Sequence, residues 1–418
     1  MEGQTIVSNT SVGGLIQRTL NRVDPRLVDH GMRVAYIVSE MLRFQGKYPP
    51  SQQELWCLTA MLHDIGAYKT EEIDKMVQFE CEGVWEHAIY GYLFLKYLSP
   101  LGDYAEAVLY HHATVDQLKA VSPPNRELAQ LIHLADRVDI FWQASKDKNK
   151  LAAYLKHGSG RVFYPEIVRL FLQTQQHCNL LDRLCCQHQP EELLQDIAQN
   201  PASGDEFLRV LIYSIDFRSS HTVTHTITTT FISYETARLM GLPPESQHHI
   251  YYGAMLHDLG KIGIPVEILE YPGKLSPQAM AIMRTHVDIT EEILEGCIDP
   301  VTTQIALRHH EKLDGSGYPR GLTAQQMTIE EQIVAIADII SALLGTRSYK
   351  AAFSRDRTLA IIKEQADAGK INARIVQTIS EHFDEILAEV KRHCDPILEI
   401  YQGIQTEYVR LLEQFHNL

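Results

Sequence analysis

Histidine and aspartate recur along this chain in an order that suits the binding of metal ions. The first half contains one series and the second half repeats its order: His30, His63, Asp64, His87, His111, His112 and Asp136, then His225, His257, Asp258, His286, His309, His310 and Asp338. Imidazole and carboxylate groups bind Fe, Mn, Zn or Ni, and several of them can hold two ions about 3.5–4 Å apart. A single histidine is usually a hydrogen-bonded core or surface residue, but two matching series of this kind are explained by metal chemistry.

The sequence around these residues is also repeated, and its apolar spacing is helical. MLHDIG (61–66) corresponds to MLHDLG (255–260), and HLADRVDIF (133–141) corresponds to AIADIISAL (335–343). Apolar residues recur three or four positions apart, and no segment alternates with a period of two. The sequence therefore predicts an all-α protein made of two tandem copies of one helical domain.

Prolines and glycines mark the ends of predicted helices and one domain boundary. Pro49 and Pro50 separate the first two predicted helices, and Gly241 with the prolines after it ends a helix in the second half. Pro, Ser and Gly cluster at 200–204. We expect an N-terminal domain with connecting helices at 1–200 and a C-terminal domain at 201–418. The Gln- and Leu-rich stretch before the boundary is either a connecting helix or the surface of a homodimer.

Composition excludes several classes of partner. The 418 residues carry a formal net charge of −15, which argues against broad electrostatic binding to a nucleic acid polymer or an anionic membrane. The N-terminus shows no secretion signal, and no apolar stretch approaches about 18 residues, so we expect a cytoplasmic protein. Seven scattered cysteines without a Cys-x-x-Cys pair predict neither disulfides nor a thiolate zinc site.

Two motifs in the second half resemble a known signature. HDLGKIGIP (257–265) and HHEKLDGSGYPRG (309–321) look like the HD-GYP pattern, a subgroup of the HD superfamily of metal-dependent phosphohydrolases. The first half resembles only the general HD superfamily. The resemblance implies an enzyme of bacterial second-messenger signalling, a phosphodiesterase that cuts cyclic di-GMP to pGpG or GMP. It also implies two or three divalent ions, Fe or Mn before Zn or Ni, and a signalling-protein partner at the Gly-Tyr-Pro loop.

The same resemblance assigns roles to individual residues. The predicted metal ligands of the second domain are His221, His225, His257, Asp258, His286, His309, His310 and Asp338, although His221 could equally be a surface histidine. Asp258 would bridge two ions and, with Lys261, would serve catalysis. Lys261, Gly317, Tyr318, Arg347 and Lys350 would contact the substrate. The family often has a second aspartate three residues after the last ligand, where this chain has Ser341.

The first domain departs further from the pattern. It keeps a full set of candidate ligands: His30, His63, Asp64, His87, His111, His112 and Asp136. Ala67 replaces the lysine, and HHATVDQL (111–118) replaces the Gly-Tyr-Pro loop. Three interpretations are open for it: a regulatory or structural metal-binding domain, an independent phosphohydrolase, or an empty scaffold.

Two classes of function remain for the whole chain. The first is an enzyme that hydrolyses cyclic di-GMP, with 3′,3′-cyclic GMP-AMP as the alternative substrate. The second is a sensor that binds a cyclic dinucleotide or metal without turnover. A lysine directed at a reacting phosphate favours the enzyme, since a sensor does not need it.

Overall fold

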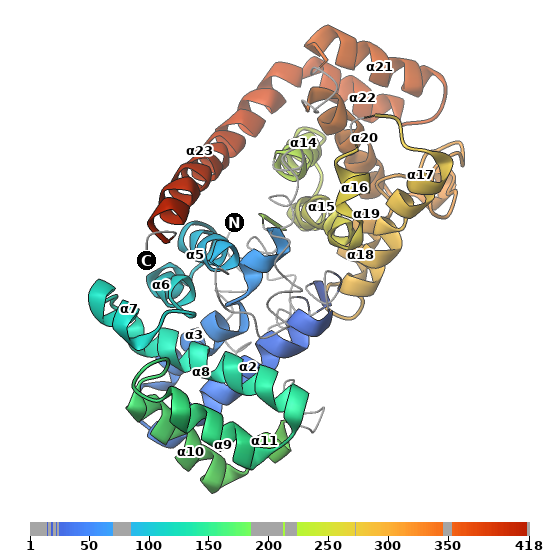
Figure 1. Cartoon of the computed structure of the whole chain (residues 1–418). Helices are drawn as coiled ribbons and strands as arrows, with labels where there is room; N and C mark the ends of the chain where they lie inside the picture. The colour runs from blue at the N-terminus through green and yellow to red at the C-terminus, as the bar shows by residue number, and fades with distance from the viewer. Residues whose placement is uncertain are drawn as a thin grey trace. The chain divides into compact units, whose positions relative to one another are not determined.

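The described part of the computed structural model is built from α-helices and short 3-10 helices (Figure 1). It describes residues 15, 18, 19, 22, 25–69, 85–184, 212, 213, 224–271, 273–345 and 353–415. Within these ranges the only extended pairings are two isolated bridges, Ser159 with Phe163 and Asp314 with Thr323. The predicted all-α fold is confirmed. No helix in the described ranges is both long and apolar enough to cross a bilayer.

The chain forms two compact units, one containing residues 12–210 and 403–418 and the other containing residues 211–402. The predicted boundary at 200–204 lies outside the described residues. The helices of the first unit are α2 (Pro25–Gln45), α3 (Pro50–Met61), η1 (Ile65–Lys69), α5 (Glu86–Leu98), η2 (Gly102–Tyr104), α6 (Ala105–Leu109), α7 (Val115–Val121), α8 (Arg126–Ser145), α9 (Lys148–Gly158), α10 (Pro165–Cys178) and α11 (Leu180–Arg183).

The second unit repeats the order of elements that carries the candidate ligands. Its helices are α14 (His225–Leu239), α15 (Pro244–Leu256), η3 (Leu259–Gly263), α16 (Val266–Leu269), α17 (Pro277–Arg284), α18 (His286–Leu294), α19 (Pro300–Leu307), η4 (Ala324–Gln326), α20 (Ile329–Leu344), α21 (Arg355–Asp367), α22 (Ala373–Glu381) and α23 (Phe383–Phe415). Thus α14, α15, η3, α18, α19 and α20 correspond to α2, α3, η1, α5, α6 and α8.

Local sequence explains where the helices begin and end. Proline is the first residue of α3 and α15, where its missing N–H costs no hydrogen bond. Gly241, in the left-handed conformation at φ +72°, follows the end of α14. The side chain of Thr328 caps α20 in a reciprocal pair with Glu331. These breakers set the lengths of the helices that carry the histidines.

The glycine of each His-Asp-x-Gly motif packs against a neighbouring helix. A Cβ atom on Gly260 would lie 2.0 Å from the carbonyl oxygen of His286, and one on Gly66 would lie 2.0 Å from that of His87. Only glycine permits this approach between η3 and α18, or between η1 and α5. The glycine therefore brings the His-Asp pair close to the third histidine of its series.

Apolar residues of α14, α15, α20 and α22 form the core of the second unit. Ile227, Ile250, Ile336, Ile340 and Ile375 are all buried in it. These side chains occupy one face of each helix, as the helical spacing predicted. The core thereby fixes α14 and α20 next to the residues that carry the ligands, since Ile227 lies two positions after His225, and Ile336 and Ile340 lie on either side of Asp338.

The end of α23 packs within the N-terminal unit, which includes the chain from residue 403 onward. Tyr408 stacks on Tyr90 with ring centroids 4.0 Å apart, and Phe415 lies 4.7 Å from Trp85. Glu407 accepts hydrogen bonds from Lys96 at 2.9 Å. These contacts cover α5, the helix that begins beside His87.

Candidate metal centres

The C-terminal unit brings seven of the predicted ligands together from five elements and the turns beside them. His225 and His286 are the first residues of α14 and α18, His257 and Asp258 lie between α15 and η3, His309 and His310 follow α19, and Asp338 lies in α20. His225 Nε2 is 3.0 Å from Asp338 Oδ1 and 3.4 Å from Asp258 Oδ2. The helix ends therefore converge on one cluster of nitrogen and oxygen atoms.

Hydrogen bonds within the turns set the tautomer of three of these histidines. Nδ1 of His257, His286 and His309 lies 2.6, 2.7 and 2.6 Å from the carbonyl oxygen three residues earlier. A carbonyl oxygen can only accept, so each Nδ1 carries the proton. Each Nε2 then presents its lone pair to the cluster, as a metal ligand requires.

The cluster divides into two groups that Asp258 connects. Ligand atoms of His225, His257 and Asp258 lie within 4.8 Å of one another, as do those of His286, His309 and His310. Asp258 Oδ2 is 3.1 Å from His257 Nε2, while its Oδ1 is 3.6 Å from His286 Nε2. Oδ1 is buried and has no hydrogen-bond partner among the described residues. A divalent ion in each group would satisfy this oxygen, so the residues fit a metal pair with Asp258 between the ions.

Burial keeps most of these imidazoles neutral. It lowers the pKa of His286, holds that of His309 well below its ordinary value and lowers that of His310 to about 3. Burial alone would also lower the pKa of His225, but hydrogen bonds with Asp258 and Asp338 raise it to about 9. His225 therefore has to release a proton before it can bind an ion.

The two carboxylates of the cluster remain ionised. Burial alone would raise the pKa of Asp258, but the charges of His257 and Lys261 hold it well below its ordinary value. The pKa of Asp338 is lowered in the same way, mainly by its hydrogen bond with His225. The cluster is thus ready to bind cations near neutral pH.

Lys261 lies beside the carboxylate of Asp258. Its ammonium nitrogen is 2.5 Å from Asp258 Oδ2, and its side chain is 22% exposed. The side chain therefore reaches both the cluster and solvent. A phosphate group that enters from solvent would meet this ammonium group next to the metal ligands.

The Gly-Tyr-Pro loop forms one wall of the cluster. The Tyr318 ring lies 4.5 Å from the His310 ring, and the Arg284 guanidinium covers it at 4.6 Å. A Cβ on Gly317 would lie 2.5 Å from the Cα of Glu311, so the loop needs glycine at this position. The buried carboxylate of Glu311 accepts the backbone N–H groups of Arg320 and Leu322. Sequence analysis missed this anchoring role of Glu311.

Three predicted residues lie outside the described part of the chain. They are His221, Arg347 and Lys350. Their predicted contacts with a third ion or with substrate stay predictions.

The N-terminal unit also assembles its full set of predicted ligands. Three groups of side chains have ligand atoms that all lie within 4.8 Å of one another. They are His63, Asp64 and His111; His30, His63 and Asp136; and His87, His111 and His112. His63 Nδ1 is 2.7 Å from the carbonyl oxygen of Ala60, so its Nε2 faces the cluster. His63 Nε2, Asp64 Oδ1 and His111 Nε2 are buried without a hydrogen-bond partner in the described ranges. These residues fit a metal ion as well.

Two arginines, Arg137 buried and Arg33 partly buried, distinguish the N-terminal cluster. Arg137 donates hydrogen bonds of 2.7 and 2.9 Å to Asp136 Oδ2, so this oxygen already accepts from an arginine. Arg33 donates two hydrogen bonds to Asp139, which in turn accepts from His30 Nδ1 at 2.8 Å. Ala67, at the position of the C-terminal lysine, is fully buried.

Sequence analysis missed Asp139 and Arg33. The signal was present in DRVD (136–139), which keeps the second aspartate that the C-terminal copy replaces. At the equivalent place in the C-terminal unit, Ser341 Oγ lies 2.9 Å from His225 Nδ1. The first histidine of each series is thus oriented by the residue three positions after the last ligand.

Comparisons with known proteins agree with this duplication. Residues 27–140 and residues 209–375 each match a family model described as an HD domain. A 3′3′-cGAMP-specific phosphodiesterase of Vibrio cholerae is 27% identical over 389 residues, which cover 87% of this chain and 89% of the relative. A cyclic di-GMP phosphodiesterase response regulator of Xanthomonas campestris is 40% identical over 178 residues, covering 42% of this chain and 47% of the relative.

A solved structure shares the two-domain fold. The crystal structure of a cyclic GMP-AMP-specific phosphodiesterase of Vibrio cholerae matches with a TM-score of 0.53 and 17% identity. The match covers 90% of this chain and 98% of that one. At this identity the likeness concerns the fold.

Proposed function

Since the chain belongs to the HD family and carries two HD domains, as its sequence predicted, we propose that it is a metal-dependent phosphodiesterase that hydrolyses a cyclic dinucleotide. The observation that carries the proposal is the C-terminal cluster, where Asp258 joins two groups of histidines and Lys261 stands beside it. Relatives named as phosphodiesterases of cyclic di-GMP and of 3′3′-cGAMP support the substrate class. We place the reaction in the C-terminal domain.

The side chains of this domain suit the hydrolysis of a phosphodiester. Divalent ions held by the cluster would supply Lewis acidity and activate water at neutral pH. Lys261, which donates to the Asp258 carboxylate, would also donate to a non-bridging phosphate oxygen, whose negative charge grows in the transition state. The ring of Tyr318 covers His310 and would border the bound substrate. No side-chain nucleophile is required.

We propose Fe or Mn as the native metal, because imidazole and carboxylate sets accept both and leave positions open for substrate. His221 is a candidate ligand for a third ion, and Arg347 with Lys350 for the substrate. The Gly-Tyr-Pro loop is the proposed contact for a signalling-protein partner. Metal analysis of the protein purified without oxygen tests the first of these assignments.

For the N-terminal cluster we propose metal binding without cyclic dinucleotide hydrolysis. Buried Ala67 offers no cation to a phosphate, and Arg137 competes with any ion for Asp136. Hydrolysis should therefore depend on the C-terminal cluster alone.

Chromatography of the products tests the proposal. The full chain, supplied with Mn²⁺ or Fe²⁺, is expected to convert cyclic di-GMP, 3′3′-cGAMP or both to a linear dinucleotide or a mononucleotide. Asp258→Asn should abolish this activity because it removes the charge that joins the two groups of ligands. Failure to cut either substrate with metal bound would contradict the phosphodiesterase, and activity that persists in Asp258→Asn would contradict its placement in the C-terminal domain.

A further inference from the structure

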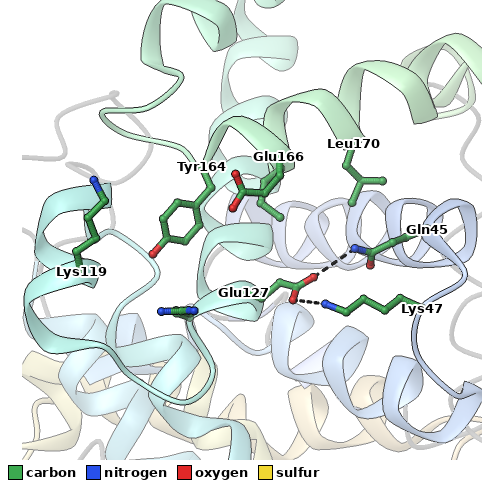
Figure 2. A pocket seen from close by; sticks show the side chains of 9 residues that line it. Gln45, Lys47, Lys119, Glu127, Tyr164, Glu166 and Leu170 are labelled. Carbon is green, nitrogen blue, oxygen red and sulfur yellow. Dashed lines mark hydrogen bonds and ion pairs between the residues drawn. The ribbon is translucent and has the colours of Figure 1, made fainter.

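A second site lies in the N-terminal unit, away from the metal ligands. It is a pocket of about 480 Å³, and none of its lining residues belongs to the histidine and aspartate series. This volume falls within the range of about 300–1,000 Å³ that small-molecule sites occupy. Figure 2 shows Lys119 and Tyr164 toward one end of the pocket, Gln45 and Lys47 toward the other, and Glu127 between them.

Two helices begin at this pocket. Arg126 and Glu127 are the first residues of α8, and Tyr164 and Glu166 flank the start of α10. Neither helix has a side-chain hydrogen bond at its N-cap. The N-terminal end of a helix carries a partial positive charge, which Glu127 in the first turn of α8 and Glu166 in the first turn of α10 partly offset. The positive charge available to a ligand therefore comes mainly from the side chains of the pocket.

The charged side chains of the pocket differ in how well they are paired. Glu127 accepts hydrogen bonds from Lys47 at 2.7 Å and Tyr48 at 2.6 Å. Burial alone would raise the pKa of Glu127, but these hydrogen bonds lower it, so its charge is compensated. Arg126 is exposed, and its guanidinium has no partner among the described residues. Among the described residues Lys119 is paired with Asp116, in a surface ion pair that competes weakly with a ligand.

The pocket also contains an acceptor that no described side chain occupies. Glu166 is exposed, and its carboxylate contacts no hydrogen-bond donor within the described ranges. Tyr164, two residues earlier, adds an aromatic ring to the same wall. The pocket therefore combines cations for an anionic group with an aromatic surface and an acceptor for N–H donors.

We propose that this pocket binds a guanine nucleotide with a free terminal phosphate. The phosphate is bound by Arg126 and Lys119, and the base packs on the Tyr164 ring. Guanine presents two adjacent donors, N1–H and the 2-amino group, which match the two oxygens of Glu166. Adenine has an acceptor at N1, which the carboxylate repels. The proposal goes beyond the hydrolysis of a cyclic dinucleotide and does not depend on it.

Isothermal titration of GMP into the full chain tests this site. EDTA in the buffer keeps metal ions from holding the nucleotide at the histidine clusters. Arg126→Ala should weaken binding by about tenfold or more, because a charge-assisted contact with phosphate is lost. Lys156→Ala is the matched control, since it removes one exposed positive charge from α9, outside the pocket.

Further ligands and one more variant test the phosphate contact and the recognition of guanine separately. AMP and inorganic phosphate should each bind about tenfold more weakly than GMP, and Glu166→Gln should reduce the preference for GMP over AMP. Both Arg126 and Glu166 are exposed, so neither variant disturbs the core. The proposal is overturned if GMP does not bind at millimolar concentration, if Arg126→Ala binds it like Lys156→Ala, or if AMP or phosphate binds as tightly as GMP.

Discussion

Ser341 is expected to control how tightly the C-terminal cluster holds its metal ions. Its Oγ lies 3.0 Å from the carbonyl oxygen of His225 and 2.9 Å from Nδ1 of the same residue. The hydroxyl has one proton, and the carbonyl can only accept it, so Nδ1–H must donate to Oγ. This arrangement directs His225 Nε2 toward Asp258 and Asp338.

Ser341→Ala removes the only acceptor that is seen for Nδ1–H in the described structure. A buried donor left without a partner costs about 1–3 kcal/mol, and the loss of a group that orients a metal ligand commonly costs about 10–100-fold in affinity. Ser341 is almost fully buried, so water does not readily replace its hydroxyl. We therefore expect the dissociation constant for Mn²⁺ at this cluster to rise by about tenfold, or about 1.4 kcal/mol.

The assay is the Mn²⁺ dependence of cyclic dinucleotide hydrolysis, together with equilibrium dialysis of Mn²⁺. Ser233→Ala is the matched control, because Ser233 is buried on the same helix as His225 and donates only to the carbonyl oxygen of Thr229 at 2.7 Å. This control loses the same kind of hydrogen bond without touching the cluster. Equal Mn²⁺ affinity in the two variants would refute the reasoning.

The N-terminal unit shows why aspartate is not a simple replacement for Ser341. There Asp139 orients His30, but Arg33 compensates its charge with two hydrogen bonds. The residue three positions after His225 is Thr228, which supplies no charge. Among the described residues, His225 is the group next to position 341 that could offset the burial of a carboxylate there.

Other changes test the remaining parts of the chain. Lys261→Ala should lower kcat on the order of 10²-fold at saturating metal, since the charge beside the phosphate is lost, and an unchanged kcat would contradict its role. Gly317→Ala should lower both kcat and the thermal stability of the C-terminal unit, because its Cβ would lie 2.5 Å from Glu311 Cα; wild-type activity and melting would show that the loop does not need this approach. Burial alone would raise the pKa of Glu407, but hydrogen bonds from Tyr97 and Lys96 lower it. The ionised Glu407 carboxylate therefore contributes its full stabilisation above its pKa in the unfolded chain, about 4.3. This stabilisation is lost as the pH falls through the lower pKa of Glu407 in the folded protein. Glu407→Gln should therefore lower the free energy of unfolding at pH 7 by about 1 kcal/mol, and the difference from wild type should narrow below about pH 4. A difference in the free energy of unfolding that does not change with pH would contradict this origin.

The sequence alone predicted the helical fold, the duplication and the candidate ligands. Helical spacing, prolines and glycines act within a few residues, so they can be read without tertiary structure. The ligands were recognisable because both copies keep the same residue types in the same order. His257, Asp258 and His286 lie in the predicted cluster because Gly260 permits η3 to approach α18.

Only the tertiary structure showed which groups support these ligands. Asp139 meets His30 across 109 residues of chain, and Ser341 meets His225 across 116. Such contacts depend on how helices pack: the stretch DRVD (136–139) marks Asp139 in the sequence, but it does not specify which residue Asp139 contacts. The pocket that contains Arg126 and Glu166 could be predicted even less from the sequence. It forms because the starts of α8 and α10 lie side by side, which brings these two side chains into one cavity. The sequence thus determined which residue types are available for metal chemistry, and packing decided how each candidate ligand is oriented and where the pocket of the N-terminal unit forms.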